Sequence, residues 1–121
     1  EWVGSPEEFP IKTKIIENNF DYKKGSELWK ELKTICYENF YEEIEIFWLS
    51  NRKKLKIKTD KIFKHLIIHV PENANYFCVE PVSHPTDGFN LAYKNIENIN
   101  CDVLMPNEKI KGLIKFEIDN F

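Results

Sequence analysis

Apolar and polar residues alternate with a period of two along most of the chain from Glu42 to the C-terminus. Such alternation predicts antiparallel strands that each place one face against a core. Short polar segments with turn-forming residues separate the alternating stretches, so the first two strands and the next two are each expected to pair as a hairpin. The predicted strands cover residues 43–49, 54–58, 62–70, 76–80 and 110–118.

The region before Glu42 has a different pattern. Apolar residues recur at helical spacing after Ser26, a residue type that caps helices, which predicts a short helix over residues 26–37. Residues 1–25 show no strong period. We therefore predict a mainly β fold of antiparallel strands with at most one short helix near residues 26–37. At 121 residues the chain is expected to form at most one domain.

Composition and charge narrow the class of protein. The chain has 121 residues, 42% of them hydrophobic, and no apolar run long enough for a membrane span. Its net charge of -3 gives no electrostatic reason to expect a nucleic acid or an anionic membrane as partner. The three cysteines contain no CxxC pair, which predicts neither a disulfide framework nor a zinc site. With no apolar leader after Glu1, these features predict a cytoplasmic protein with reduced thiols.

One basic segment and one cysteine have simple structural interpretations. Lysines alternate with Leu55 and Ile57 between Arg52 and Lys58, which favours a strand with a solvated face over an anion-binding patch. Cys78 lies in the middle of an apolar strand. It is therefore interpreted as a small core residue rather than as a nucleophile.

Two histidines, His65 and His69, lie four residues apart in a predicted strand. They share a face of that strand, but their Cα atoms would be roughly 13 Å apart, too far to hold one metal ion together. Two interpretations stay open. Either imidazole lines the sheet and hydrogen-bonds a polar ligand, or it is a partly buried structural residue.

Glu80 is the strongest candidate for chemistry. It precedes Pro81, which cannot donate to a strand ladder and is expected to end the strand. The carboxylate would then project where the sheet gives way to a stiff polar loop that carries His84. From composition alone, Glu80 could also be a solvent-exposed glutamate at the end of a strand with no catalytic role.

The segment around Glu80 carries a family resemblance. Residues 78–91 read CVEPVSHPTDGFNL and resemble the C-terminal signature of the aldose 1-epimerase (galactose mutarotase-like) family. The resemblance covers most of residues 9–118 and maps onto only the C-terminal part of a family member. Weaker likenesses, in the family's order, lie at residues 20–25, 66–71 and 104–108.

The resemblance implies an all-β antiparallel β-sandwich, with residues 1–121 either a single domain or the C-terminal fragment of a larger galactose mutarotase-like domain. It also implies interconversion of the α and β anomers of a free aldohexose by acid–base ring opening, without a metal or an organic cofactor. Glu80 would be the general base, and His84, Asp87 and Asn90 would shape the substrate site. The family's acidic histidine belongs to a region with no match in this chain. The family's sugar-binding aspartate matches a tyrosine, next to Glu38, which could take its role.

We therefore expect an aldose 1-epimerase-like isomerase that has little activity as this chain alone. Its partners would be an aldohexose and either the missing N-terminal portion or another copy of the chain. Two alternatives stay open. One is a non-catalytic carbohydrate-binding or assembly module on the same fold; the other is a hexose-phosphate epimerase, for which Arg52 is the only arginine in the sequence.

Overall fold

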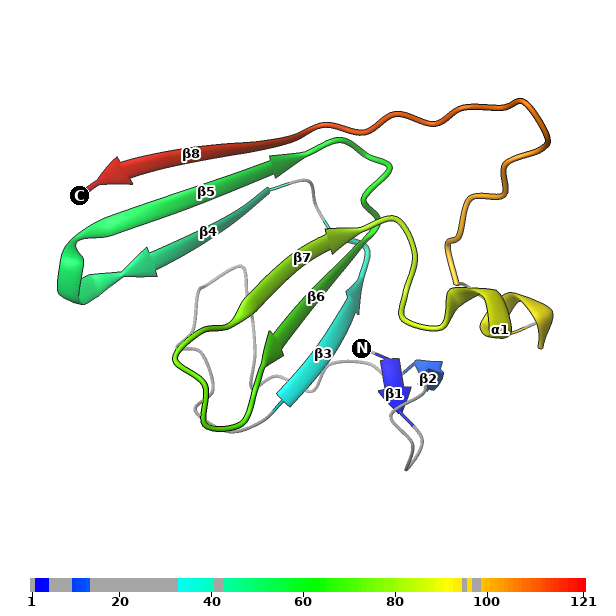
Figure 1. The fold of residues 1–121 in the computed structure, drawn as a ribbon, viewed down its shortest axis with the longest axis horizontal. Coiled ribbons are helices and arrows are strands. Elements are labelled where there is room, and N and C mark those ends of the chain that lie inside the picture. The colour runs from blue at the N-terminus through cyan, green and yellow to red at the C-terminus, as the bar shows by residue number, and fades with distance from the viewer. Residues whose placement is uncertain (1, 5–9, 14–32, 41–42, 95, 97–98) are drawn as a thin grey trace.

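The computed structural model of the chain describes residues 2–4, 10–13, 33–40, 43–94, 96 and 99–121. Within these residues the sheets are antiparallel, and the helical elements are one short α-helix and one 3-10 turn, so the predicted all-β class is confirmed (Figure 1). The elements in chain order are β1 (Trp2–Gly4), β2 (Pro10–Thr13), β3 (Lys33–Glu38), β4 (Glu43–Trp48), η1 (Leu49–Asn51), β5 (Lys53–Thr59), β6 (His65–Val70), β7 (Cys78–Val82), α1 (Gly88–Tyr93) and β8 (Ile114–Asn120).

The described strands form two three-stranded sheets and a small β1–β2 hairpin. The strand order is β4-β5-β8 in one large sheet and β3-β6-β7 in the other. Figure 1 shows β8 along the outer edge of its sheet and α1 on the opposite side of the molecule. A long extended segment, drawn in orange, returns from α1 to the start of β8.

The β4-β5-β8 sheet contains the first predicted hairpin. β4 and β5 pair with Ile44 opposite Ile57, and β8 joins the other side of β5. The last strand begins at Ile114 instead of the predicted residue 110. Its partner β5 ends at Thr59, so the residues before Ile114 have no strand beside them in the described structure.

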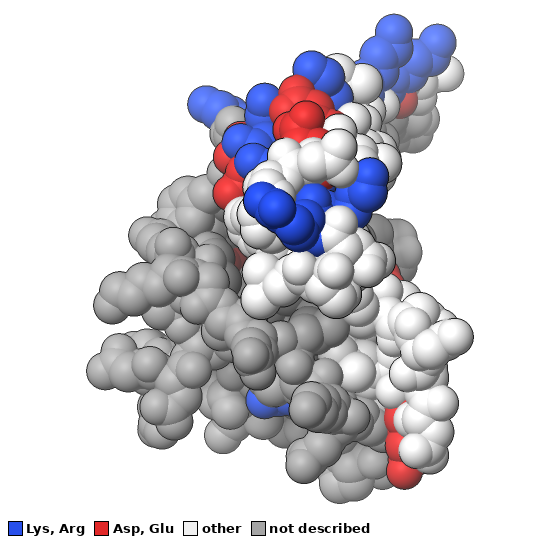
Figure 2. All heavy atoms as spheres, turned by 90° about the vertical axis from the view of Figure 1, so that its left-hand side faces the viewer, with Lys and Arg blue, Asp and Glu red and all other residues white. Residues whose placement is uncertain are grey.

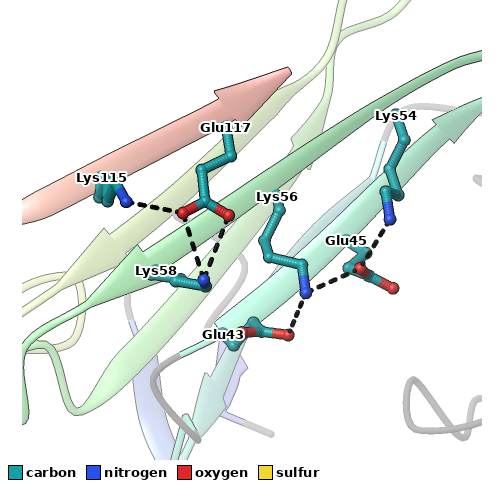
Figure 3. Close-up of polar contacts among 7 residues, drawn as sticks. All are labelled: Glu43, Glu45, Lys54, Lys56, Lys58, Lys115 and Glu117. Atoms are coloured by element: carbon teal, nitrogen blue, oxygen red, sulfur yellow. Dashed lines mark hydrogen bonds and ion pairs between the residues drawn. The ribbon is translucent and has the colours of Figure 1, made fainter. Parts of the chain in front are cut away.

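One face of this sheet is charged, and cross-strand ion pairs neutralise it (Figure 3). The Nζ atom of Lys56 lies 3.1 Å from Glu43 and 3.2 Å from Glu45 of the neighbouring strand. On the other side of β5, Lys58 lies 3.1 Å from Glu117 of β8. Figure 2 shows basic and acidic side chains intermingled at this end of the molecule. The basic segment thus forms the predicted strand, and its Lys54, Lys56 and Lys58 are partly exposed and paired with glutamates.

The β3-β6-β7 sheet contains the second predicted hairpin. β6 and β7 pair with Ile67 opposite Glu80. The prediction that Pro81 ends the strand, with Glu80 as its last residue, is wrong. β7 continues to Val82, and Pro81 lies opposite Leu66. Because β7 is an edge strand, a proline with no N–H is tolerated within it.

The predicted helix near residues 26–37 is wrong where the structure describes it. Residues 33–37 belong to β3, and residues 26–32 lie outside the described part of the chain. Ile35, Cys36 and Tyr37 are all buried because both faces of β3 are covered, so apolar and polar residues do not alternate there. The α-helix among the described residues is α1, and none of the helices described has the length and apolar character needed to cross a membrane.

Two small cores cover the opposite faces of the β3-β6-β7 sheet. On one face, Leu66 and Ile68 belong to a cluster against which Ile44 of the other sheet packs. On the opposite face, Leu91 of α1 packs with Cys36 of β3. Leu91 is 2% exposed, so this contact anchors the short helix to the sheet.

Candidate functional site

Glu80 lies between two histidines on the face of the β3-β6-β7 sheet that Leu91 of α1 partly covers at Cys36 and Ile67. It is opposite Ile67 of β6, and His65 and His69, two residues to either side of Ile67, belong to the same face. Diagonal neighbours in an antiparallel pair have Cα atoms about 7–8 Å apart, within reach of long side chains. Glu80 is exposed, so the register places an accessible carboxylate next to two imidazoles.

His69 is the more accessible imidazole of the two. It lies opposite Thr34 of β3, and its Nδ1 atom is 2.7 Å from the Thr34 hydroxyl oxygen. This contact holds the ring in place and leaves Nε2 as the nitrogen that can meet a ligand. In the imidazolium form the Nδ1–H donates to the Thr34 hydroxyl oxygen, and the Nε2–H is left to donate to a ligand.

His65 is a buried structural histidine. It is 0% exposed, and its Nε2 atom lies 3.1 Å from the carbonyl oxygen of Ile99. Its Nδ1 atom has no hydrogen-bond partner in the described structure. Burial lowers the pKa of His65, because the imidazolium form would lose its hydration. Of the two interpretations of the histidines, ligand binding fits His69 and a structural role fits His65.

Glu38 lies on the same face as Glu80, with β6 between them. It is directly opposite His65, partly buried, and its Oε1 atom has no hydrogen-bond partner among the described residues. Burial raises the pKa of Glu38 above its usual value. A buried oxygen without a partner is unfavourable, which favours the protonated form of this carboxyl group.

The loop after β7 folds back against the sheet. Pro85 is fully buried, and the backbone of Thr86 lies against the thiol of Cys36. His84 remains exposed, with its Nδ1 atom 3.1 Å from the Ser83 hydroxyl oxygen. The structure therefore anchors this loop beside β3 and presents His84 on its surface.

Asp87 and Asn90, the two other predicted substrate-binding residues, bond to each other. The side-chain amide of Asn90 donates to the carboxylate of Asp87, and Asp87 adopts a left-handed backbone with φ 60° immediately before α1. Part of their hydrogen-bonding capacity is thus used within the chain. They lie at the start of α1, whereas Glu38 and Glu80 lie on the sheet.

Thiol and metal chemistry have little support in the described part of the chain. All three cysteines are free. Burial raises the pKa of Cys36 to about 11 and also raises that of Cys101, which disfavours their thiolate forms. Cys78 is partly buried within β7. Among the described histidines, cysteines and acidic residues, no group of three is arranged to hold a metal ion.

Arg52 lies in the other sheet, at the turn between β4 and β5. Its Nε atom donates to the carbonyl oxygen of Phe121 at 2.7 Å. The single arginine of the chain is therefore engaged with the end of β8 and does not belong to the sheet that carries Glu80.

The association of Glu80 with His69 is the feature that the sequence analysis missed. Both residues lay in the predicted hairpin, but its register was not assigned, and Thr34 was inside the predicted helix. Counting outward from the loop over residues 71–77 would pair Val70 with Cys78 and put Ile68 opposite Glu80. The structure has the register shifted by one residue, with His69 opposite Cys78 and Ile67 opposite Glu80, so the sequence carried no reliable signal for it.

Comparison of the chain with protein-family models, with curated proteins and with solved structures finds no match in any of the three. The family resemblance of the segment around Glu80 therefore stays an expectation from the sequence. What the chain does has to be inferred from the side chains on this face of the sheet.

Proposed function

We propose that the chain binds an aldohexose on the face of the β3-β6-β7 sheet that carries Glu80 and interconverts its anomers as an aldose 1-epimerase-like isomerase. The observation that carries the proposal is that the strand register places an exposed carboxylate diagonally next to an imidazole whose Nδ1 is already held. Glu80 supplies the carboxylate, and His69, oriented by Thr34, supplies the imidazole.

The two groups match the two proton transfers of ring opening. Glu80 takes the proton from the anomeric hydroxyl while His69, acting as the imidazolium with its Nδ1–H donated to the Thr34 hydroxyl, gives its Nε2 proton to the ring oxygen. The ring opens to the aldehyde and His69 is left as a neutral imidazole. Rotation about the C1–C2 bond and reversal of both transfers closes the ring to the other anomer. Protons return to their starting groups, so the cycle needs no cofactor.

Glu38 and His84 are suited to binding rather than to proton transfer. Glu38 is partly exposed on the same face of the sheet, so the accessible part of its carboxyl group can accept a sugar hydroxyl, whereas its Oε1 atom is buried. His84 lies exposed on the loop that packs against β3. These residues would hold the sugar while Glu80 and His69 act on it.

A second candidate function is non-catalytic carbohydrate binding on the same face. The observation that favours it is the internal pairing of the loop side chains, since His84 contacts Ser83, and Asp87 contacts Asn90. Such pairing stabilises the loop but leaves fewer polar groups to position a transition state. This candidate predicts saturable sugar binding without faster mutarotation.

The test is to follow the optical rotation of freshly dissolved α-glucose and α-galactose with the 121-residue chain and with Glu80→Gln. Loss of the base is expected to lower the catalysed rate at least about 100-fold. Glu72→Gln, in the exposed loop between β6 and β7, is the matched control and should keep the rate. An unchanged rate in Glu80→Gln would show that Glu80 is not the base.

Titration calorimetry with the same sugars separates the two candidate functions. Saturable binding with no catalysed rotation by the unchanged chain supports the binding module. If neither sugar binds and neither changes its optical rotation faster, both proposals are overturned for these ligands. Circular dichroism of each variant confirms that the sheets are intact.

A further inference from the structure

The outer edge of β8 is open in the described structure. In the β4-β5-β8 sheet, β8 pairs with β5 on one side, and no described strand lies beyond it (Figure 1). The strand is seven residues long, pairs without a bulge, and contains no proline. Phe116 is 62% exposed and Ile118 is 74% exposed. A long, regular edge strand with exposed apolar side chains readily pairs with another strand.

The hydrogen bonds to β5 define which backbone groups of β8 face outward. At the two ends, Asp60 N–H donates to the carbonyl of Leu113 at 3.1 Å, and Phe121 N–H donates to the carbonyl of Arg52 at 3.2 Å. Because alternate residues of an antiparallel strand bond to the same neighbour, the odd-numbered residues of β8 face β5. The N–H and C=O groups of residues 114, 116, 118 and 120 therefore face the open edge.

These outward groups match those of a second β8 in antiparallel orientation. A two-fold axis at Glu117, the central residue of the strand, overlaps all seven residues of both copies. It places Phe116 of each copy opposite Ile118 of the other copy. The exposed aromatic and aliphatic side chains therefore meet across the junction. Both of these residues have outward-facing backbone groups, as hydrogen-bonded pairs require.

The same axis pairs opposite charges on the other face of the sheet. Lys115 comes opposite Asp119 of the second copy, and this pair occurs twice. Glu117 comes opposite its own equivalent, but each copy already surrounds Glu117 with Lys58 and Lys115, at 3.1 and 2.8 Å (Figure 3). These two lysines in each copy offset the repulsion between the two carboxylates.

The other edge of the sheet is not complementary to itself. β4 presents Glu43 and Glu45 on its charged face and no basic residue. Two copies of β4 placed edge to edge would bring these carboxylates together without a cation from either edge strand. Lys54 and Lys56 of β5 already pair with these glutamates, so self-pairing through β4 would gain no ion pair between copies like that of Lys115 with Asp119.

We infer that β8 is a dimerisation edge, where a second copy of the chain adds antiparallel about a two-fold axis at Glu117 to form a continuous six-stranded sheet. The pairing is closed, because each copy uses its β8 edge once. It extends the proposed function without depending on it, since the β3-β6-β7 face and the β8 edge belong to different sheets.

The test is sedimentation velocity of the 121-residue chain over a dilution series, with two charge variants. In the Asp119→Lys homodimer, both contacts between residues 115 and 119 would bring two lysines together. In the Lys115→Asp homodimer, both contacts would bring two aspartates together. Each variant alone is expected to dimerise at least about tenfold more weakly than the unchanged chain. An equimolar mixture pairs lysine with aspartate at both positions and is expected to restore the dimer.

Ile118→Pro provides a second test that does not depend on charge. Its N–H faces the open edge, so the substitution should abolish the dimer while circular dichroism remains that of the folded chain. The proposal is overturned if the unchanged chain stays monomeric, if it forms open-ended assemblies, or if mixing the two charge variants restores no dimer.

Discussion

Glu38 and His65 lie directly opposite each other across β3 and β6, and each keeps one buried polar atom without a hydrogen-bond partner in the described structure. Burial raises the pKa of the carboxyl group and lowers that of the imidazole, so both groups are pushed towards their neutral forms. The folding stability of the chain should therefore respond to pH in opposite directions through these two residues.

We expect the folded state to lose stability between pH 7.5 and pH 5 because of His65. The folded-state pKa of His65 lies below its ordinary value of about 6.5, so the unfolded chain binds the proton first as pH falls. The stability contributed above pH 6.5 is lost as pH falls towards the folded-state pKa. Thermal unfolding should show a lower midpoint at pH 5 and a smaller drop in His65→Gln, whose amide can still donate to Ile99.

His84→Gln is the control for this pH dependence, because His84 is exposed. It should keep the decrease in unfolding midpoint seen in the unchanged chain. An equal decrease in His65→Gln and in the unchanged chain would assign the effect to other groups.

We expect Glu38→Gln to stabilise the fold at neutral pH. A raised carboxyl pKa means that its favourable contribution is present below about pH 4.5 and is lost as pH rises through the folded-state value. The uncharged amide avoids that loss and should raise the free energy of unfolding by up to about 1 kcal/mol at pH 7, with little gain at pH 4. Urea unfolding at the two pH values measures the difference.

Glu45→Gln is the contrasting variant. The hydrogen bond from Lys56 lowers the pKa of Glu45, and its loss should slightly destabilise the fold at pH 7.

If Glu38 also accepts a sugar hydroxyl, Glu38→Gln should weaken sugar binding while it stabilises the fold. A stabilising change that weakens binding is typical of a ligand site and not of a structural residue.

We expect Leu91→Ala to cost about 2–5 kcal/mol of unfolding free energy, because the side chain is almost fully buried against Cys36. Denaturant unfolding measures this cost. Tyr93→Ala, on the same helix but 87% exposed, should change stability by less than about 0.5 kcal/mol. Similar values for the two variants would mean that α1 does not pack through Leu91.

We expect Thr34→Val to lower the mutarotation rate about tenfold without unfolding the sheet, because His69 would lose the contact that orients its ring. Thr34→Ser keeps the hydroxyl and should keep most of the rate. The pH dependence of the rate should shift in Thr34→Val, a change that general destabilisation would not produce. A rate equal to that of the unchanged chain would remove Thr34 from the site.

The strands were predictable where one face of a strand is solvated and the other packs on apolar neighbours. In β4 the alternation of isoleucine with Glu43 and Glu45 marks the two faces directly. In β3, Ile35, Cys36 and Tyr37 are buried on both faces, so the alternation disappears and the pattern resembled a helix. The helix α1 was missed because Asp87 and Gly88 are typical turn residues and the helix buries only Gly88 and Leu91.

The sequence by itself determined that the chain is mainly β and which segments pair as hairpins. It also made Glu80 the candidate for a catalytic carboxylate. These properties follow from local alternation and residue type. The tertiary structure decided that His69 lies beside Glu80, that His65 is buried, and that Glu38 shares their face. A shift of two residues in register would keep every side chain on the same face but change its neighbours, so only the long-range pairing of the strands defines the site.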